Sequence, residues 1–347
     1  MDHISGIDRH QIQMLALDDF VAKDSMARVI DAFVDTLDFE KFEFSYFKLN
    51  KEGRPPFHPS VMMKIYLYGY QNSIRSCRKL EQACKVNMEM LWLVEGRKPH
   101  YKTIAKFRKD NSKGFRDVFR HFVLVLKNWN LIEGKTIAID SFKIRAQNSL
   151  KNNFNDRKIK RHIDYIDKKI AEYEASLDEE FRVETLKKID RQLTKKEQYL
   201  KAKEQLSETT DGQISTTDPD SRAVVFQRNS VKIGYNIQAA SDAKHKLLIA
   251  ADTGDVNDTK ALSPMIELCQ ENLKASGKSI DVIADKGYHS GREIQAAEKL
   301  NATTFLSPKE SSSMKKNPAF AMESFEYNET DDTYTCPAGE VMQTNRR

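Results

Sequence analysis

The chain has 347 residues, of which 39% are hydrophobic and 31% charged, and its formal net charge is +5. This length allows two or three domains with a full-sized core. No apolar run approaches the length of a membrane span, so the composition excludes a helical membrane protein. The N-terminus opens on Met1-Asp2-His3 without the apolar block of a signal peptide, and we expect a cytoplasmic protein.

The four cysteines have no spacing typical of a metal site or a disulfide framework. Cys77 and Cys84 lie seven residues apart in a helical pattern, which is typical of buried thiols. Cys336 is followed by Pro337-Ala338-Gly339, and no later residue could complete a cysteine group. Disulfide or zinc chemistry is therefore not expected.

Residues 1–132 are predicted to form an all-helical domain. Apolar residues spaced three and four apart predict a helix from Met26 to Leu37, with Asp24 or Ser25 as its cap. A second helix begins at Pro59-Ser60, because proline is favoured at the first helical position. Further helices are expected over Ser76 to about Leu91, from a cap at Thr103, and over Phe115–Leu126.

Positive charge is concentrated between Arg97 and Arg120. This segment holds nine Lys or Arg and two acids, a local excess of +7 that is larger than the excess of the whole chain. Such a patch is the electrostatic footprint of binding to a phosphate backbone, and the helix after Thr103 would present it to DNA. The alternatives are a solvated helix face and a domain that serves only as a scaffold. The candidate DNA-contacting residues here are Lys102, Lys106, Arg108 and Lys109.

Two short apolar runs end in aspartate: Thr136–Ile139 precedes Asp140, and Ile280–Ala284 precedes Asp285. Each run predicts a buried strand that stops at its carboxylate. If the two strands are neighbours in one sheet, both carboxylates lie at the same edge. Two hard oxygen ligands on rigid strands fit a Mg²⁺ site for phosphate chemistry. Taken singly, each aspartate could instead be an exposed residue at a strand end or helix entry.

A segment rich in Lys and Glu, residues 155–206, separates these runs and contains neither Gly nor Pro. Its heptad spacing predicts an antiparallel helical hairpin inserted between strands of the sheet. The predicted seam consists of Ile159, Ile163, Ile166, Ile170, Tyr173 and Leu177, followed by Leu186, Ile189, Leu193 and Leu200. The hairpin could serve in dimerisation, clamp DNA, or simply pack on itself.

The remaining pattern, after a polar linker over Ser207–Ser221, alternates strands and helices. Asp242 is expected in a tight turn between strands, and Asn257 or Asp258 is expected as a helix cap. The predicted strands are Arg222–Phe226, Lys232–Ala240, Lys246–Ala251 and Thr303–Leu306, with a helix over Gly291–Leu300 before the last. Residues 133–310 are therefore predicted to form an α/β domain with a mixed sheet flanked by helices.

The order and spacing of several sequence pieces resemble the DDE transposases of bacterial insertion sequences. In the second part of the chain these pieces are Asp140 with Lys143-Ile144-Arg145-Ala146, then Gly234-Tyr235-Asn236-Ile237-Gln238, then Ala284-Asp285-Lys286-Gly287-Tyr288-His289-Ser290. In the first part they are Gly53-Arg54-Pro55-Pro56-Phe57-His58-Pro59, Ser76-Cys77-Arg78-Lys79-Leu80 and Thr103-Ile104-Ala105-Lys106-Phe107-Arg108.

The resemblance implies a ribonuclease H-like fold and metal-dependent DNA cleavage and strand transfer, with Asp140 as the first acid and Asp285 as the second. Mg²⁺ would be the cofactor, with Mn²⁺ as a substitute, and Lys143, Arg145 and Lys286 would contact phosphate. The implied partners are the transposon ends, the target DNA and a second copy in a homodimer, without any membrane. A bacterial, nucleoid-associated location follows from those partners.

The resembling family carries a third acid, a Glu on a helix after the last strand, and no such pattern occurs between Leu306 and Arg347. The glutamates in this part, Glu323, Glu326, Glu329 and Glu340, lie in a hairpin-like stretch. We therefore expect residues 311–347 to be an irregular, truncated segment and the active site to be incomplete. Three hypotheses stay open: an active transposase with an unrecognised third acid, a non-catalytic DNA-binding remnant, and a ribonuclease H-like nuclease, which the helical first domain disfavours.

Overall fold

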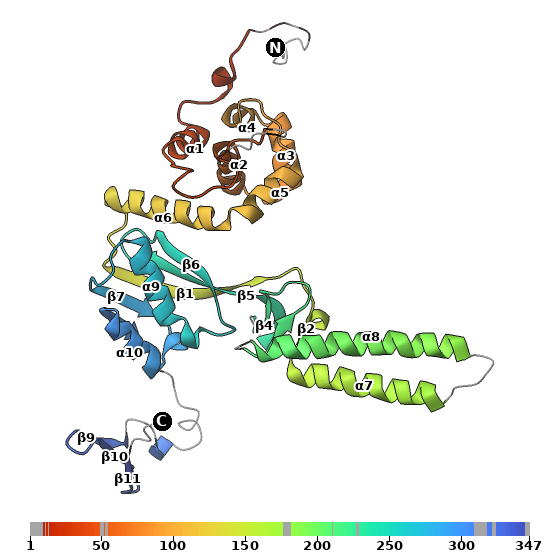
Figure 1. Cartoon of the computed structure of the whole chain (residues 1–347). Coiled ribbons are helices and arrows are strands. Elements are labelled where there is room, and N and C mark those ends of the chain that lie inside the picture. The colour runs from red at the N-terminus through yellow and green to blue at the C-terminus, as the bar shows by residue number, and fades with distance from the viewer. Residues whose placement is uncertain are drawn as a thin grey trace, which may run out of the picture. The chain divides into compact units, whose positions relative to one another are not determined.

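The computed structural model describes residues 10, 12, 14–48, 52, 55–175, 182–209, 211–226, 229–308, 318–320 and 324–343. The chain divides into two compact units, Met1–Phe122 and Val123–Arg347 (Figure 1). This division falls inside α6 (Ser112–Asn128), upstream of the boundary expected after residue 132.

The described part of the first unit is helical, as predicted. Besides α6 and the short 3-10 turn η1 (Leu17–Phe20), its helices are α1 (Met26–Asp35), α2 (Pro59–Gln71), α3 (Cys77–Val86), α4 (Met88–Leu93) and α5 (Tyr101–Asp110). The central helix is α2, which is buried on most sides because it is apolar on most sides. Its buried Lys64 forms ion pairs with Asp31 (2.6 Å) and Asp35 (2.9 Å) of α1, so the charge is compensated.

Asn87 interrupts the single helix expected over Ser76–Leu91. Its side chain accepts a hydrogen bond from the Met90 backbone N–H (2.8 Å) and thereby begins α4 one residue after α3 ends. Asparagine is among the strongest N-cap residues, so the split has a local cause that the apolar pattern hid. By contrast, Ser25 caps α1 as predicted and accepts from the Ala27 N–H (3.1 Å).

The start of α5 also differs from the prediction. His100 caps this helix by accepting from the Lys102 N–H, and Thr103 lies within the first turn. Lys102 therefore lies in the first turn of α5, and Lys106, Arg108 and Lys109 lie further from the helix N-terminus than a cap at Thr103 would place them.

Of the two thiols predicted to be buried, Cys84 is buried and burial raises its pKa to about 11, whereas Cys77 is only half-buried.

The second unit is organised around a six-stranded mixed sheet of order β4-β5-β1-β7-β8, with β6 also pairing with β5. Its strands are β1 (Thr136–Arg145), β4 (Arg222–Val225), β5 (Val231–Asp242), β6 (Leu248–Gly254), β7 (Ile280–Ala284) and β8 (Ala302–Leu306). The strands β1, β7 and β8 run parallel, while β5 is antiparallel to β1, β4 and β6. Two helices, α9 (Leu262–Asn272) and α10 (Gly291–Lys299), accompany the sheet (Figure 1). The predicted ribonuclease H-like mixed sheet is confirmed.

The strand β1 is longer than predicted. It pairs with β7 only over Thr136–Ile139, but its antiparallel ladder with β5 continues from Ile137 to Arg145. The prediction that the strand stops at Asp140 is therefore wrong, because the hydrogen bonds to β5 extend the strand beyond its apolar part. Asp140 is exposed and lies in the middle of the strand.

Asp242 ends β5 and is almost fully buried, rather than being a simple turn residue. One carboxylate oxygen accepts from the backbone N–H groups of Glu133 (3.2 Å) and Gly134 (2.7 Å), and the other accepts from the backbone N–H of Lys244 (3.0 Å). The carboxylate therefore fixes the segment before β1 to the β5–β6 turn, which is a structural role.

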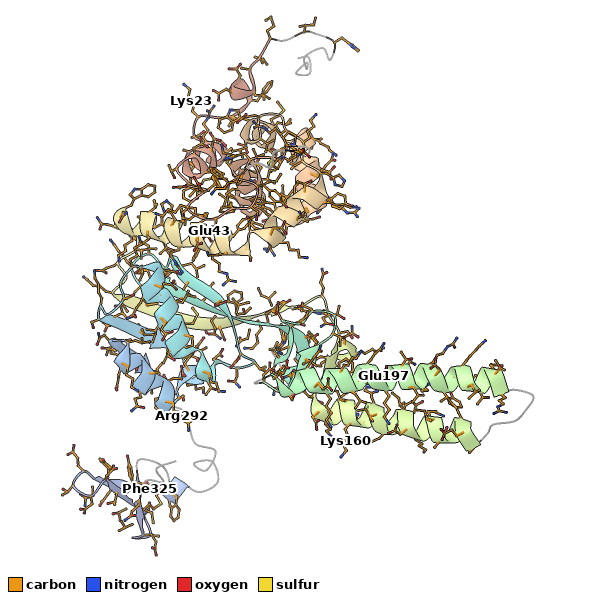
Figure 2. The ribbon with its side chains drawn as sticks, viewed as in Figure 1. Lys23, Glu43, Lys160, Glu197, Arg292 and Phe325 are labelled. Atoms are coloured by element: carbon orange, nitrogen blue, oxygen red, sulfur yellow. The ribbon has the colours of Figure 1, made fainter. Side chains whose placement is uncertain are left out.

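The predicted helical hairpin is present as α7 (Asp156–Ala175) and α8 (Arg182–Ser207). Its base is closed by β2 (Asn153–Phe154), which pairs with β3 (Ile214–Ser215). A small core at this base consists of Phe154, Ile159, Ala202, Leu206 and Ile214. Lys160 on α7 and Glu197 on α8 are exposed (Figure 2).

Only part of the predicted seam packs inside the hairpin. Ile159 and Ile166 of α7 are buried as expected, and Leu177 lies outside the described residues. On α8, however, three predicted seam residues are exposed by almost half: Leu186, Leu193 and Leu200. The packed face of α8 is instead one that includes Thr185, Ala202 and Leu206, so the predicted register of this helix is wrong.

The described C-terminal residues form a separate three-stranded antiparallel sheet of β9 (Glu326–Asn328), β10 (Thr333–Thr335) and β11 (Val341–Gln343). Glu326, Glu329 and Glu340 lie in or beside these strands, and Glu323 lies outside the described residues. The other short elements are the 3-10 turns η2 (Leu150–Asn152), η5 (Asp258–Lys260), η6 (Lys286–Tyr288) and η7 (Pro318–Phe320). Among all described helices, none is both long and apolar enough to cross a bilayer.

Candidate functional site

The parallel ladder between β1 and β7 brings the two predicted aspartates together. Its last pair is Ile139 with Ala284. Asp140 is the next residue of β1, and Asp285 directly follows the end of β7. Neighbouring strands lie about 4.8 Å apart, so the two backbones present their carboxylates at adjacent positions of one sheet edge. Both aspartates are exposed.

Each of these carboxylates is held by one short local hydrogen bond. Asp140 Oδ1 accepts from the Ser141 N–H (2.7 Å), and Asp285 Oδ1 accepts from the Gly287 N–H (2.7 Å) at the start of η6. Within the described residues, neither Oδ2 atom has a hydrogen-bond or ion-pair partner. The two side chains are thus oriented while one oxygen of each stays available.

A third carboxylate, that of Asp258, lies beside this pair. A Cβ atom built on Gly287 would lie 2.8 Å from Asp285 Oδ1 and 3.5 Å from Asp258 Oδ2, so both oxygens face the same small space. The hypothesis of a helix cap fits Asn257, which accepts from the Thr259 N–H at the start of η5, and not Asp258.

The sequence alone does not predict Asp258 as a neighbour of the two aspartates, but the sheet topology explains its position. The strand β6 is antiparallel to β5, and β5 is antiparallel to β1, so β6 runs in the same direction as β1. Its carboxyl end therefore reaches the same edge of the sheet, four residues before Asp258. The strand order is needed to see that Asp258 and the two aspartates lie at the same edge, and a single sequence does not give that order.

Two buried amides and a phenol lie beside the acids and form hydrogen bonds with one of them, Asp258 directly or through Gln238. Asp258 Oδ1 accepts from Asn236 Nδ2 (2.9 Å) and from Gln238 Nε2 (2.7 Å), and the Tyr288 hydroxyl donates to Gln238 Oε1. Burial raises the pKa of Tyr288, and the carboxylates of Asp258, Asp140 and Asp285 raise it further, so the phenol stays protonated. Asn236, Gln238 and Tyr288 are all less than 3% exposed.

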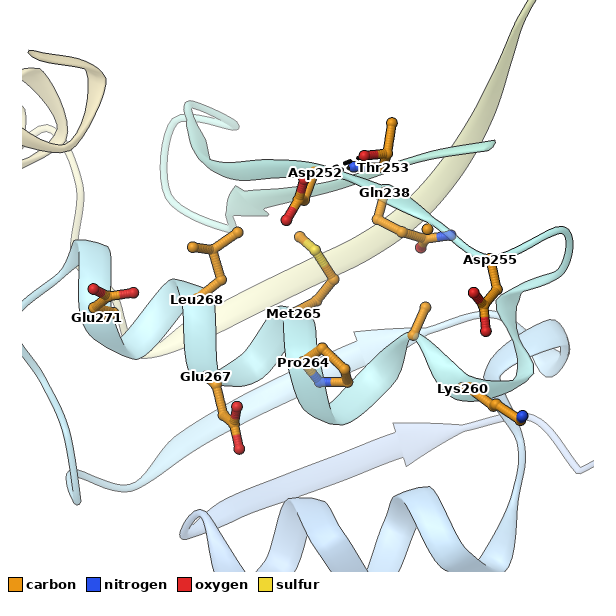
Figure 3. A pocket seen from close by; sticks show the side chains of 12 residues that line it. Gln238, Asp252, Thr253, Asp255, Lys260, Pro264, Met265, Glu267, Leu268 and Glu271 are labelled. Carbon is orange, nitrogen blue, oxygen red and sulfur yellow. Dashed lines mark hydrogen bonds between the residues drawn. The ribbon is translucent and has the colours of Figure 1, made fainter. Parts of the chain in front are cut away.

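A pocket of about 620 Å³ lies between β6 and α9, next to Gln238 (Figure 3). Its acidic lining residues are Asp252, Asp255, Glu267 and Glu271, and Lys260 is also in the wall. A wall with this excess of carboxylates repels phosphate. We therefore regard the exposed edge at Asp140 and Asp285, rather than this pocket, as the site that could receive a phosphodiester.

The three cations predicted near the acids are placed differently from one another. Lys286 directly follows Asp285 and is exposed. Lys143 and Arg145 lie further along β1, on the face opposite to the Asp140 side chain, because successive strand residues alternate between faces. Lys286 is thus adjacent in the chain to one of the two acids, whereas Lys143 and Arg145 lie on the other face of β1.

The four basic residues predicted on α5 are exposed, but part of their charge is compensated. Lys106 donates to the Tyr46 hydroxyl (2.5 Å) and lies 3.5 Å from Asp110, and the Arg108 guanidinium lies 5.5 Å from the centre of the Tyr70 ring. Lys102 and Lys109 have no ion-pair partner in the described part of the chain.

A pocket of about 420 Å³ adjoins α5. Its wall includes Tyr46 and Phe57 together with Lys98, Lys102 and Lys106. Aromatic rings beside lysines are typical of surfaces that bind nucleic acid strands.

Among the described residues, no group of three or more His, Cys, Asp or Glu side chains is close enough to hold a metal ion.

Comparison with known proteins gives two family matches. Residues 15–110 match the model of a transposase domain (DUF772), and residues 133–340 match the model of the transposase DDE domain. No curated protein matches the chain. A solved structure, the cryo-EM structure of the piggyBac transposase synaptic complex with hairpin DNA, is 10% identical with a TM-score of 0.33. That match covers 84% of this chain, which spans only 52% of the piggyBac chain.

Proposed function

The chain belongs to the transposase DDE domain family, and from this premise we propose that it catalyses metal-dependent DNA cleavage and strand transfer at the ends of an insertion sequence. The observation that carries this proposal is the adjacency of Asp140 and Asp285 at the end of the β1–β7 ladder. Two carboxylates held by neighbouring strands are a pair that a cation could bridge.

The residues present fit a divalent cation. Carboxylate oxygens are the ligands that Mg²⁺ prefers, and the uncommitted Oδ2 atoms of Asp140 and Asp285 supply them. The space beside Gly287, which any larger residue would fill, keeps Asp285 Oδ1 and Asp258 Oδ2 accessible. We propose Asp140 and Asp285 as the ligands, with Mn²⁺ as a substitute metal. When bound, Mg²⁺ would activate the attacking oxygen and stabilise the leaving oxygen of an in-line displacement.

The other residues of the site would orient DNA. We propose that Lys286, which is exposed and follows Asp285, contacts the reacting phosphate, and that Lys143 and Arg145 contact the DNA backbone further along the strand. In the first unit, Lys102, Lys106, Arg108 and Lys109 would bind phosphates of the element end. These contacts position DNA and carry no base specificity by themselves.

We also propose that the protein acts as a homodimer on bacterial DNA, associated with the nucleoid. Support for a dimer comes from Leu186, Leu193 and Leu200, which repeat every seven residues along the exposed side of α8. A leucine stripe at heptad spacing is the pattern by which two helices pair. The dimer would hold two element ends in one complex.

The test is cleavage of a duplex carrying the host element's own ends, in Mg²⁺ and in Mn²⁺. Asp140→Asn and Asp285→Asn should lower the rate on the order of a hundredfold or more, because charge stabilisation by the metal contributes several kcal/mol. Asp281→Asn, on the same strand as Asp285 but at its opposite end, is the matched control and should cleave normally. A wild-type chain that binds the ends without cutting them would instead support the second hypothesis, a non-catalytic DNA-binding remnant.

A further inference from the structure

One buried side chain, that of Gln238, connects three elements that surround the acids. Gln238 lies on β5 directly opposite Ser141, the residue after Asp140. Its Nε2 donates to Asp258 of η5, and its Oε1 accepts from Tyr288 of η6, the turn that Asp285 caps. The amide is therefore the one group in this network that joins the β1–β5 ladder, η5 and η6.

The chemistry of its neighbours fixes the orientation of the Gln238 amide. A carboxylate can only accept, so Asp258 requires the NH₂ group, and the oxygen is left to accept from the Tyr288 hydroxyl. Both bonds are buried, where an unmade hydrogen bond costs about 1–3 kcal/mol. A side chain bonded at both ends in this way cannot shift without moving one of its partners.

We propose that Gln238 is a positioning residue for the proposed metal site: through Tyr288 and Asp258 it holds the Asp285 turn beside Asp140. This inference rests on the proposed function, because it concerns the same two carboxylates. Gln238 does not touch the Oδ2 atoms of Asp140 or Asp285 by any hydrogen bond in the described chain. Gln238 would therefore change the affinity of the carboxylate pair for a cation, because residues behind metal ligands commonly affect metal affinity.

Gly254 provides an independent way to disturb this amide. A Cβ atom on Gly254 would lie 2.9 Å from both Cγ and Nε2 of Gln238. Such a separation is too short for unbonded heavy atoms, so Gly254→Ala must displace the Gln238 side chain without removing any polar group. Gly254→Ala and Gln238→Met should therefore have the same consequence for different reasons.

Two matched controls separate positioning from general destabilisation. Gln270 is also buried, and its Nε2 donates to the Leu300 carbonyl (2.7 Å). It has no acidic partner among the described residues, so Gln270→Met removes a comparable buried amide. Apart from its chain neighbours and its own helix, no described residue comes within 4 Å of a Cβ atom built on Gly291, so Gly291→Ala is the control for the glycine substitution.

The experiment is a titration of the full chain with Mn²⁺ alone, followed by the free-Mn²⁺ EPR signal, with and without an element-end duplex. Thermal unfolding and the Mn²⁺ dependence of cleavage are measured beside it. Gln238→Met and Gly254→Ala should weaken Mn²⁺ binding by about tenfold or more, which is the usual range for residues behind metal ligands. Both control variants should bind Mn²⁺ like the wild type, and Gln270→Met should lower only the melting temperature.

Other results would overturn the proposal. If Gln238→Met changes only the melting temperature, as Gln270→Met does, the residue is structural and the inference fails. If Asp258→Asn abolishes Mn²⁺ binding as fully as Asp140→Asn, Asp258 is itself a ligand and the positioning assignment is wrong. The proposed function fails separately, if Asp140→Asn and Asp285→Asn bind Mn²⁺ as well as the wild type.

Discussion

Asp140 and Asp285 are neighbours across two parallel strands, although 145 positions separate them in the chain. Each follows the last paired residue of its strand in the β1–β7 ladder, so the hydrogen-bond register of the sheet sets their relative position. A shift of one residue would turn one carboxylate to the other face of the sheet. Four predictions concern this arrangement, the helical unit and the α7–α8 hairpin.

Gly287→Ala should impair the proposed activity more than it impairs stability. The new Cβ would lie 2.8 Å from Asp285 Oδ1 and force that carboxylate to move. A displacement of about 1 Å at a reacting centre can cost a hundredfold in rate, and we expect a loss of about tenfold to a hundredfold in cleavage. Cleavage and melting temperature are compared with those of Gly291→Ala. Unchanged cleavage would show that the space beside Gly287 is not used.

Glu89→Gln should destabilise the helical unit by about 1–2 kcal/mol at pH 7, since hydrogen bonds to a charged group are the stronger kind. The Ser25 hydroxyl (2.5 Å) and the Tyr68 hydroxyl (2.6 Å) both donate to Glu89 and lower its pKa below 4.5. A depressed carboxyl pKa contributes stability that is fully present above the unfolded value and is lost as the pH falls through the folded value.

Urea unfolding from pH 7 down to pH 3 measures this contribution. The wild type should lose its advantage over Glu89→Gln as the pH falls below 4.5, and the two curves should converge. Glu40→Gln removes an exposed ion pair with Lys48 and serves as the control with little effect. A difference between wild type and Glu89→Gln that persists at pH 3 would contradict the explanation.

Lys102→Gln combined with Lys109→Gln should weaken binding to any DNA duplex. Each phosphate contact that is lost lowers the slope of log affinity against log salt by about one, so the double variant should lose about two. Lys113→Gln is the matched control, because Lys113 on the neighbouring helix already pairs with Glu43. Fluorescence anisotropy at roughly 50 to 200 mM salt measures the affinity of each protein for DNA and therefore the slope. Equal slopes for all three proteins would remove α5 from the DNA interface.

Leu193→Lys should dissociate the proposed dimer. Leu193 is the centre of the exposed leucine stripe, and burying an ammonium group in a helix pair costs at least about 1.4 kcal/mol, which is tenfold in the dissociation constant. Tyr165→Lys, at an exposed apolar position on α7, is the control. Sedimentation equilibrium measures the dissociation constant of the dimer for both variants. A dimer that survives Leu193→Lys must use another surface.

The sequence was sufficient for the elements whose signals are local. The apolar run before each aspartate, the cap at Ser25 and the hairpin over residues 155–206 all predicted the observed structure. The α8 register was not predictable in the same way, because Leu186, Leu193 and Leu200 satisfy a heptad pattern although they lie on the exposed side of the helix. The small core at the β2–β3 base includes Ala202 and Leu206 and marks the face of α8 that packs inward.

Of the candidate site, the sequence predicts the two strands that lead to Asp140 and Asp285 but not the residues that surround these acids. Asp258, Gln238 and Tyr288 come from three elements separated by turns, and their meeting depends on β6 and β7 reaching the same edge of the sheet. Strand order is a long-range property, whereas sequence patterns describe neighbours along the chain. For the same reason, the sequence pattern predicts only a helix cap at Asn257 or Asp258 and gives no sign that Asp258 lies near Asp285.

The short pairing of β2 with β3 makes the α7–α8 hairpin a replaceable module. Phe154 lies opposite Ile214 and Asn153 opposite Ser215, so both ends of the insertion leave the fold side by side. Because loop-closure entropy depends only weakly on length, the segment between these strands could be shortened, lengthened or exchanged for a small reporter domain at little thermodynamic cost to the sheet. A change in the length of the hairpin would then require no change in β1, which carries Asp140, or in β7, which precedes Asp285.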